Sequence, residues 1–103
     1  MSGPVHVEVS AVAAAQIRVA EAWWRTNRPK APNAIREELE RAWALVAAQP
    51  DIGSRARNLK LAGVRRVHLS RIRYYLYYRV SENPTQIEIL GFWHSSRGGQ
   101  PPI

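Results

Sequence analysis

The chain has 103 residues, of which 46% are hydrophobic, and it carries a net charge of +7 with no cysteine. This length suffices for one domain with one modest core, and the hydrophobic content excludes a disordered chain. The lack of cysteine excludes disulfides, cysteine-ligated zinc and thiol catalysis, and it is typical of a reducing cytoplasm. Gln16, Arg18 and Glu21 interrupt the Ala-rich N-terminal region, so we expect neither a signal peptide nor a membrane span.

Positive charge is concentrated in the second half of the chain. Residues 1–50 hold six Lys or Arg against five Glu, whereas residues 51–103 hold nine against three acidic residues, a net charge of +6. A field of this sign attracts nucleic acid or an acidic protein. A solubilising surface would also be basic, so composition alone leaves both interpretations open.

The first half of the chain predicts a short strand and a helix. Residues 5–9 alternate apolar and polar side chains, as a strand does. Ser10 is a favourable N-cap for a helix expected over residues 11 to about 27. The apolar stripe that should face the core comprises Ala13, Ile17, Ala20 and Trp24, widened by Val12, Val19 and Trp23.

A second helix follows a break that contains Pro29 and Pro32. Prolines end one helix and are tolerated in the first turn of the next, so we expect this helix from residue 32 or 33 to Ala48. Its buried stripe should comprise Ile35, Leu39, Ala42, Trp43 and Val46. The two helices would form an antiparallel hairpin.

Strands dominate the second half. Residues 50–61 indicate a turn-rich connector followed by a loop or irregular strand, and three strands are expected at about 64–69, 73–81 and 86–93. Residues 82–85 should form the hairpin turn between the last two strands. Residues 95–103 are expected to form a flexible tail, held only where Arg97 or Ile103 finds a partner. The order β-α-α-β-β-β predicts a single α+β domain over residues 1–103, with a helical hairpin on one face of a small antiparallel sheet.

Residues 71–80 sort by parity, because successive side chains on a strand point to opposite faces. One set is apolar and aromatic and should face the core: Ile72, Tyr74, Leu76, Tyr78 and Val80. The other set is cationic and aromatic and should face outward: Arg71, Arg73, Tyr75, Tyr77 and Arg79. Such a surface suits an anionic or nucleotide-like partner, although a solvent-facing strand with cross-strand Tyr pairs would show the same pattern.

His94 is the strongest candidate for acid–base chemistry. It ends the last strand beside Ser95, Ser96 and Arg97, and a phosphoryl transfer needs both a group that titrates near neutrality and cations around the developing charge. His94 could equally hydrogen-bond a neighbouring backbone group. Three dispersed histidines and no suitable spacing predict no metal site, and no cofactor motif is present.

Three tryptophans lie on the predicted helices. Trp24 and Trp43 fit the buried stripes and indicate core packing. Trp23 neighbours Trp24 and cannot point the same way, so one of the two should lie at the edge of the hairpin, where an exposed aromatic side chain would mark a protein contact.

The chain resembles the RelE/ParE superfamily of bacterial toxins over about residues 4–102. The element order carries this resemblance together with segments 24–29, Gly63-Val64-Arg65-Arg66, Tyr74–Val80 and the closing Trp93-His94-Ser95-Ser96-Arg97. The resemblance implies a toxin of a type II toxin–antitoxin pair. It also implies neutralisation by an acidic antitoxin, ParD-like or similar, whose disordered tail folds onto the toxin to form a hetero-oligomer.

The resemblance leaves two activities open. RelE-like members cut mRNA on the ribosome with basic residues of the sheet and C-terminus, whereas ParE-like members act against DNA gyrase. Tyr75 and Ser95 stand where the nucleases tend to carry Arg, and residues 100–103 offer no late Tyr. These departures favour the ParE-like branch, because a cleaving site must stabilise extra negative charge.

We therefore expect a cytoplasmic, ParE-like inhibitor of DNA gyrase that is not an enzyme. The alternatives are a metal-independent, RelE-like endoribonuclease and a basic binding module without toxicity. Target binding is predicted for Arg65, Arg66, His68, Arg71, Arg73, Tyr75, Tyr77, His94 and Arg97. A nuclease would use His94 for proton transfer, with Arg97, Arg73 and Arg66 holding phosphate. Antitoxin binding is predicted for Trp23, Trp24, Trp43 and Arg73.

Overall fold

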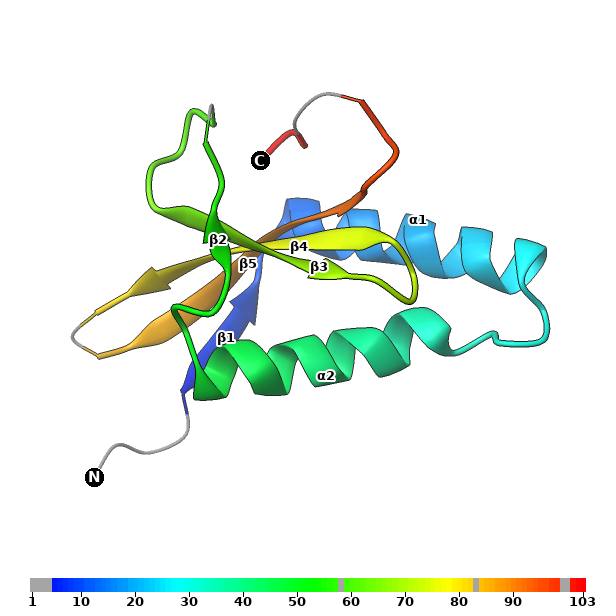
Figure 1. The fold of residues 1–103 in the computed structure, drawn as a ribbon, viewed down its shortest axis with the longest axis horizontal. Helices are drawn as coiled ribbons and strands as arrows, with labels where there is room; N and C mark the ends of the chain where they lie inside the picture. The colour runs from blue at the N-terminus through cyan, green and yellow to red at the C-terminus, as the bar shows by residue number, and fades with distance from the viewer. Residues whose placement is uncertain (1–4, 58, 83, 99–100) are drawn as a thin grey trace.

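Two helices cover one face of a five-stranded sheet in the computed structural model, which describes residues 5–57, 59–82, 84–98 and 101–103 (Figure 1). The elements in chain order are β1 (His6–Val9), α1 (Ala11–Asn27), α2 (Ala34–Ala48), β2 (Ser54–Arg55), β3 (Val64–Leu69), β4 (Tyr74–Ser81) and β5 (Gln86–His94). The predicted α+β class and element order are confirmed. The structure adds β2 within the segment that was expected to be a loop or irregular strand.

The sheet has the strand order β1-β5-β4-β3-β2. Neighbouring strands are antiparallel except for β1, which lies parallel to β5. The predicted antiparallel sheet is therefore confirmed for β2 to β5, and only the edge strand β1 departs from it. Parallel neighbours need a long crossover connection, and here both helices and three strands separate β1 from β5 along the chain.

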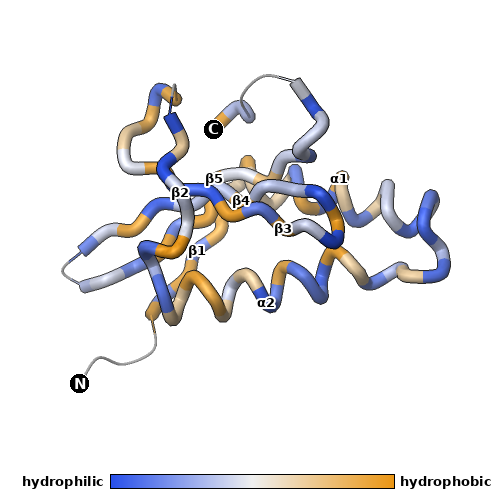
Figure 2. Tube along the Cα trace, viewed as in Figure 1, coloured by the Kyte–Doolittle hydropathy of each residue, from blue (hydrophilic) through white to orange (hydrophobic). Residues whose placement is uncertain are grey.

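An N-cap and two prolines set the ends of the helices. The side chain of Ser10 accepts a hydrogen bond from the backbone N–H of Ala13 at 3.0 Å, which confirms the predicted N-cap of α1. α1 ends at Asn27, before the two prolines of the connection, and α2 begins at Ala34, beyond them. The connection is mostly hydrophilic in Figure 2, and its Ala31 packs against the main core.

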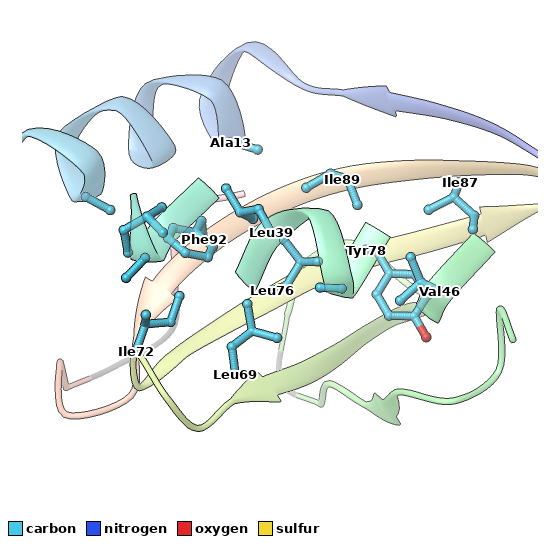
Figure 3. Packing of buried hydrophobic residues seen from close by; sticks show 14 residues of the cluster. Ala13, Leu39, Val46, Leu69, Ile72, Leu76, Tyr78, Ile87, Ile89 and Phe92 are labelled. Carbon is cyan, nitrogen blue, oxygen red and sulfur yellow. The ribbon is translucent and has the colours of Figure 1, made fainter. Parts of the chain in front are cut away.

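The main core lies between the helices and the facing side of the sheet (Figure 3). It confirms the predicted inward set: Ile72, Leu76 and Tyr78 are buried, and Tyr74 and Val80 pack against them. The predicted width of the α1 stripe is wrong. Ala13 and Ala20 are buried in the core and Ile17 and Trp24 pack against it, whereas the three residues that were expected to widen the stripe are exposed: Val12, Val19 and Trp23.

A second, smaller cluster lies on the face of the sheet away from the helices, here called the outer face. Val64, Tyr77 and Leu90 are buried there, and residues 56, 59 and 61 pack over them together with Ile103. Leu90 is the extra residue at a register shift, since Tyr77 pairs with Gly91 and Tyr78 with Ile89. Tyr77 is only 2% exposed, so the expectation that it faces outward freely is wrong.

The end of the chain folds back onto the outer face (Figure 1). Pro101 is buried and Ile103 packs into the second cluster. Ile103 therefore holds the end of the chain against the sheet. Asn83, in the predicted hairpin turn, and residues 99–100, in the predicted tail, lie outside the described residues. Neither α1 nor α2 is long and apolar enough to span a bilayer, and the described part of the chain holds no other α-helix.

Candidate functional site

Three aromatic rings line up across the outer face. Backbone pairing places His68 opposite Tyr75, and Tyr75 opposite Trp93, on β3, β4 and β5. The rings of His68 and Tyr75 lie 4.9 Å apart. The guanidinium of Arg66 lies 4.1 Å from the centre of the Tyr75 ring, and that of Arg97 lies 3.9 Å from the Trp93 ring. We call these five residues the arginine–aromatic row.

The two guanidinium groups of the row are available for a ligand. Neither Arg66 nor Arg97 pairs with a carboxylate among the residues that the structure describes. The only side-chain hydrogen bond of Arg66 in this set joins it to the hydroxyl of Tyr77, at a long 3.4 Å. A guanidinium that lies flat on an aromatic ring keeps its N–H edge free for an oxyanion, which it can bind through two parallel hydrogen bonds.

A basic groove of about 380 Å³ lies beside the row, between β2 and the start of β3. Arg55 and Arg57 line it and are exposed, and no ion pair of either is found in the described part of the chain. Arg65 also lines the groove, but it is anchored: it donates to the carbonyl of Gly53 at 2.7 Å and lies 3.7 Å from Asp51. Arg65 therefore serves the structure as well as the surface.

Two predicted outward arginines lie elsewhere. β4 begins at Tyr74, so Arg71 and Arg73 belong to the turn before it, and the expectation that they extend the outer face is wrong. Arg71 reaches the helix layer, where it donates to Glu37 at 3.0 Å and to Glu38 at 3.1 Å. These two hydrogen bonds raise the pKa of Arg71. Arg73 is exposed and has a φ of 62°. A turn at this point changes the direction of the chain. Alternation along a strand cannot predict such a turn.

His94 lies on the helix side of the sheet. Its ring stands edge-on to Tyr74 at 5.0 Å, and its Nδ1 accepts a hydrogen bond from the backbone N–H of Ser96 at 3.1 Å. The hydroxyl of Ser96 lies 2.7 Å from the same nitrogen. The neutral ring therefore carries its proton on Nε2. Burial raises the pKa of Tyr74, although the nearby charge of Arg97 opposes this shift.

The four residues of the predicted nuclease set do not meet at one point. His94 and Arg97 line a shared hollow of about 320 Å³ with Tyr74, Val19 and Trp23. Arg66, by contrast, stacks on Tyr75 on the outer face, and Arg73 lies in the turn. Within the described residues, no group of three or more His, Cys, Asp or Glu side chains lies close enough together to hold a metal ion.

The predicted antitoxin-binding tryptophans differ in accessibility. Trp24 and Trp43 pack against the main core, as expected, and Trp43 also lines a hollow of about 350 Å³ with Leu39 and Arg36. Trp23 is 46% exposed. It continues an exposed apolar line along one side of α1, here called the α1 ridge, which comprises Val12, Val19 and Trp23.

Three residues of this surface cannot be predicted from the alternation of residues 71–80: Trp93, Arg55 and Arg57. Trp93 belongs to the arginine–aromatic row because of its pairing with Tyr75, and the sequence signal would have been its position on the last strand. Arg55 and Arg57 lie in a segment without periodicity, and only the pairing of β2 with β3 brings them to the sheet. No pattern in the sequence indicated that pairing.

Comparisons with known proteins identify a family from the sequence and similar folds among solved structures. The family model described as "ParE toxin of type II toxin-antitoxin system, parDE" matches residues 7–98. A search of curated proteins found no match. A structure of the chromosomal ParDE system from P. aeruginosa has a TM-score of 0.69 at 19% identity, covering 90% of this chain and 98% of that one.

Two further solved structures share the fold. The isolated RelE toxin from E. coli has a TM-score of 0.65 at 17% identity, covering 91% of this chain and 87% of that one. A chain of the toxin–antitoxin complex RelBE2 from Mycobacterium tuberculosis has a TM-score of 0.60 at 24% identity, covering 89% and 99%. The resemblance to the superfamily is thus confirmed at the level of fold. Because the family model spans nearly the whole chain, the protein belongs to the ParE toxin family of type II toxin–antitoxin systems.

Proposed function

We propose that the protein is a ParE-like toxin that inhibits DNA gyrase by binding it, and that a cognate antitoxin neutralises it. The family match over residues 7–98 supports this proposal. One structural observation favours binding over catalysis: His94 and Arg66 lie on opposite faces of the sheet. A nuclease needs its proton-transfer group and its phosphate-binding cations around one reacting phosphate.

Gyrase would be contacted by the outer face and the end of β5. The outer face presents Arg66, His68 and Tyr75, and Arg97 extends this surface past the end of the strand. Arg65 and Arg71 are held by contacts of their own and Tyr77 is buried, so these three residues supply no free charge to this surface. The toxin would act in the cytoplasm.

Plasmid supercoiling tests the proposed target. Purified toxin is added to gyrase, ATP and relaxed plasmid, and the products are separated after protein digestion. We expect loss of supercoiled product and accumulation of linear DNA. The variant Arg66→Gln/Arg97→Gln should be much weaker, whereas Arg18→Gln, which removes one exposed charge on α1, should act like the parent toxin. Supercoiling that is undiminished by excess toxin would contradict the proposal.

The antitoxin would bind the helix side. The α1 ridge is apolar and exposed, and the hollow beside it is rimmed by Arg97 and His94. Arg28 also lies 5.4 Å from the ring of Trp23. An acidic, amphipathic segment fits this combination, because its apolar residues would cover the ridge and its carboxylates would meet the cations. Trp23 is therefore the central antitoxin contact, with Trp43 contributing where it lines its own hollow.

Cleavage of mRNA on the ribosome is the second candidate function. The likeness in fold to RelE and the positions of Arg66 and His68 on one exposed face favour it. Primer extension on transcripts from translating ribosomes tests it directly. New 5′ ends that appear with the toxin and vanish in His94→Ala would establish the nuclease, and intact transcripts would exclude it.

A further inference from the structure

We infer that the outer face binds the phosphate backbone of a DNA strand directly, without the help of a protein target. Inhibition of an enzyme by protein contact alone requires no such site. The phosphodiester class of the ligand follows from the geometry, and the choice of DNA over RNA rests on the proposed function.

Two arginines stack on neighbouring aromatic rings of the outer face. Arg66 lies on Tyr75, Arg97 lies on Trp93, and these two rings are partners on adjacent strands. Stacking fixes the plane of each guanidinium before any ligand arrives, so less side-chain entropy is lost when its N–H edge binds a phosphate. Two guanidiniums held on neighbouring rings of β4 and β5 could each bind a phosphate of one backbone.

The arginines of the second half of the chain differ in whether a carboxylate lies beside them. Among the described residues of the second half of the chain, the arginines with carboxylate partners are Arg65, Arg71 and Arg79, whose partners lie at 3.7, 3.0 and 2.9 Å. In the described part of the chain no such pair involves Arg66 or Arg97, nor Arg55 or Arg57 in the neighbouring groove. Unpaired positive charges along one face repel one another, and binding of a polyanion reduces this repulsion.

Two segments shape the outer face. The segment after β2 and the C-terminal end both rise from the outer face (Figure 1). Residues of both pack over the buried Tyr77 and Leu90. The unpaired arginines lie around this cluster. Arg55 and Arg57 are exposed and line the groove at β2, whereas the half-buried Arg66 stacks on Tyr75 and the exposed Arg97 on Trp93. A DNA strand could therefore cross the sheet from the groove to the end of β5 and contact all four arginines.

Fluorescence anisotropy of a labelled thymidine oligonucleotide of about 20 nucleotides measures the proposed binding without gyrase. We expect a dissociation constant on the order of 10 µM near physiological salt. Four phosphate contacts predict a slope of about −3 in the logarithm of affinity against the logarithm of salt, at about 0.7 per contact. Absence of binding even at about 50 mM salt would overturn the inference.

Matched variants locate the site. Arg66→Gln and Arg97→Gln should each weaken binding roughly tenfold at low salt, and each should reduce the slope by about 0.7. Arg55→Gln/Arg57→Gln alters two exposed residues outside both core clusters and should reduce the slope by about 1.4. Arg18→Gln removes the same charge on the helix side and should leave the slope unchanged. Equal losses in all variants would overturn the inference.

Competitors test the class of ligand. Unlabelled thymidine oligonucleotide should displace the probe, and polyglutamate of equal charge should displace it at least roughly tenfold less well, because a carboxylate chain lacks the spacing of phosphates. A uridine oligonucleotide that binds more than tenfold better would overturn the choice of DNA. A toxin that inhibits gyrase but binds no oligonucleotide refutes this inference alone, whereas one that binds but does not inhibit refutes the proposed function alone.

Discussion

The backbone N–H of Gly53 donates a hydrogen bond of 2.9 Å to the hydroxyl of Tyr78. That hydroxyl donates in turn to the carbonyl of Pro50 at 2.8 Å, and Arg65 donates to the carbonyl of Gly53. Tyr78 is fully buried in β4, so one side chain at the centre of the sheet fixes the connector after α2. The connector leads into β2 and the basic groove, and this contact therefore positions part of the binding surface.

Gly53→Ala should destabilise the protein by about 2–4 kcal/mol, because a Cβ would crowd the hydroxyl and the buried hydrogen bond would be lost. The added Cβ would lie 2.7 Å from the Tyr78 hydroxyl and 2.9 Å from the carbonyl of Arg66. Urea unfolding measures the loss. Gly98→Ala is the control, since nothing lies within 4 Å of a Cβ there. Equal stability of the two variants would contradict the role of this contact.

Alkaline pH should destabilise the fold through its buried tyrosines. Burial raises the pKa of Tyr78 and of Tyr74. A group whose pKa is higher in the folded state favours folding fully below the unfolded value of about 10, and this contribution is lost as pH rises through the folded value. Unfolding free energy should therefore be flat near pH 8 and fall above about pH 10.

Tyr78→Phe separates these effects. It should lower stability at neutral pH by about 1–3 kcal/mol, because the N–H of Gly53 loses its partner. It should also reduce the alkaline decline, since one of the two tyrosines whose pKa is raised by burial is gone. Urea unfolding of parent and variant across the pH range gives both quantities, and an alkaline decline identical in the two proteins would contradict the assignment.

The α1 ridge predicts a strong effect on antitoxin binding with little effect on stability. Val19 is 69% exposed, so Val19→Asp should change unfolding free energy by less than about 0.5 kcal/mol. In the complex, the new carboxylate would be buried against apolar groups and should weaken antitoxin binding by at least roughly tenfold. Isothermal titration with the cognate antitoxin measures this change.

Ile52→Asp is the matched control for the ridge. Ile52 is 46% exposed and lies in the connector after α2, away from α1. Antitoxin affinity should be unchanged in this variant. Loss of affinity in Ile52→Asp but not in Val19→Asp would move the antitoxin site to the other end of the molecule.

His94→Ala distinguishes the two candidate activities. A binding toxin should lose less than roughly tenfold in growth inhibition, whereas loss of general acid–base catalysis costs roughly 10²–10⁴-fold. Growth arrest on induction, normalised to toxin level, measures the effect. Ser96→Ala is the control for a structural effect of losing the His94 contact, because it removes the hydroxyl 2.7 Å from His94 and leaves the ring in place. A large loss in His94→Ala alone would support the nuclease.

Local sequence determined the helices, the three long strands and their inward residues. The Ser10 cap, the prolines after α1 and the alternation through β4 are short-range signals, and each acts on the backbone within a few residues. The predicted strand over residues 64–69 matches β3 at both ends. The resemblance to the toxin superfamily likewise used motifs that are contiguous in the chain.

Tertiary structure alone decided which of these residues act together. The turn before β4 turned Arg71 toward Glu37 and Glu38, and the register shift at Leu90 buried Tyr77 under the returning chain end. Pairing between strands brought Trp93 beside Tyr75, which alternation within one strand cannot reveal. The alternation of residues along a strand assigns each side chain to one face of the sheet. What that side chain contacts depends on segments that are distant in the sequence. Those contacts decide whether an arginine is paired with a carboxylate or free to bind a ligand.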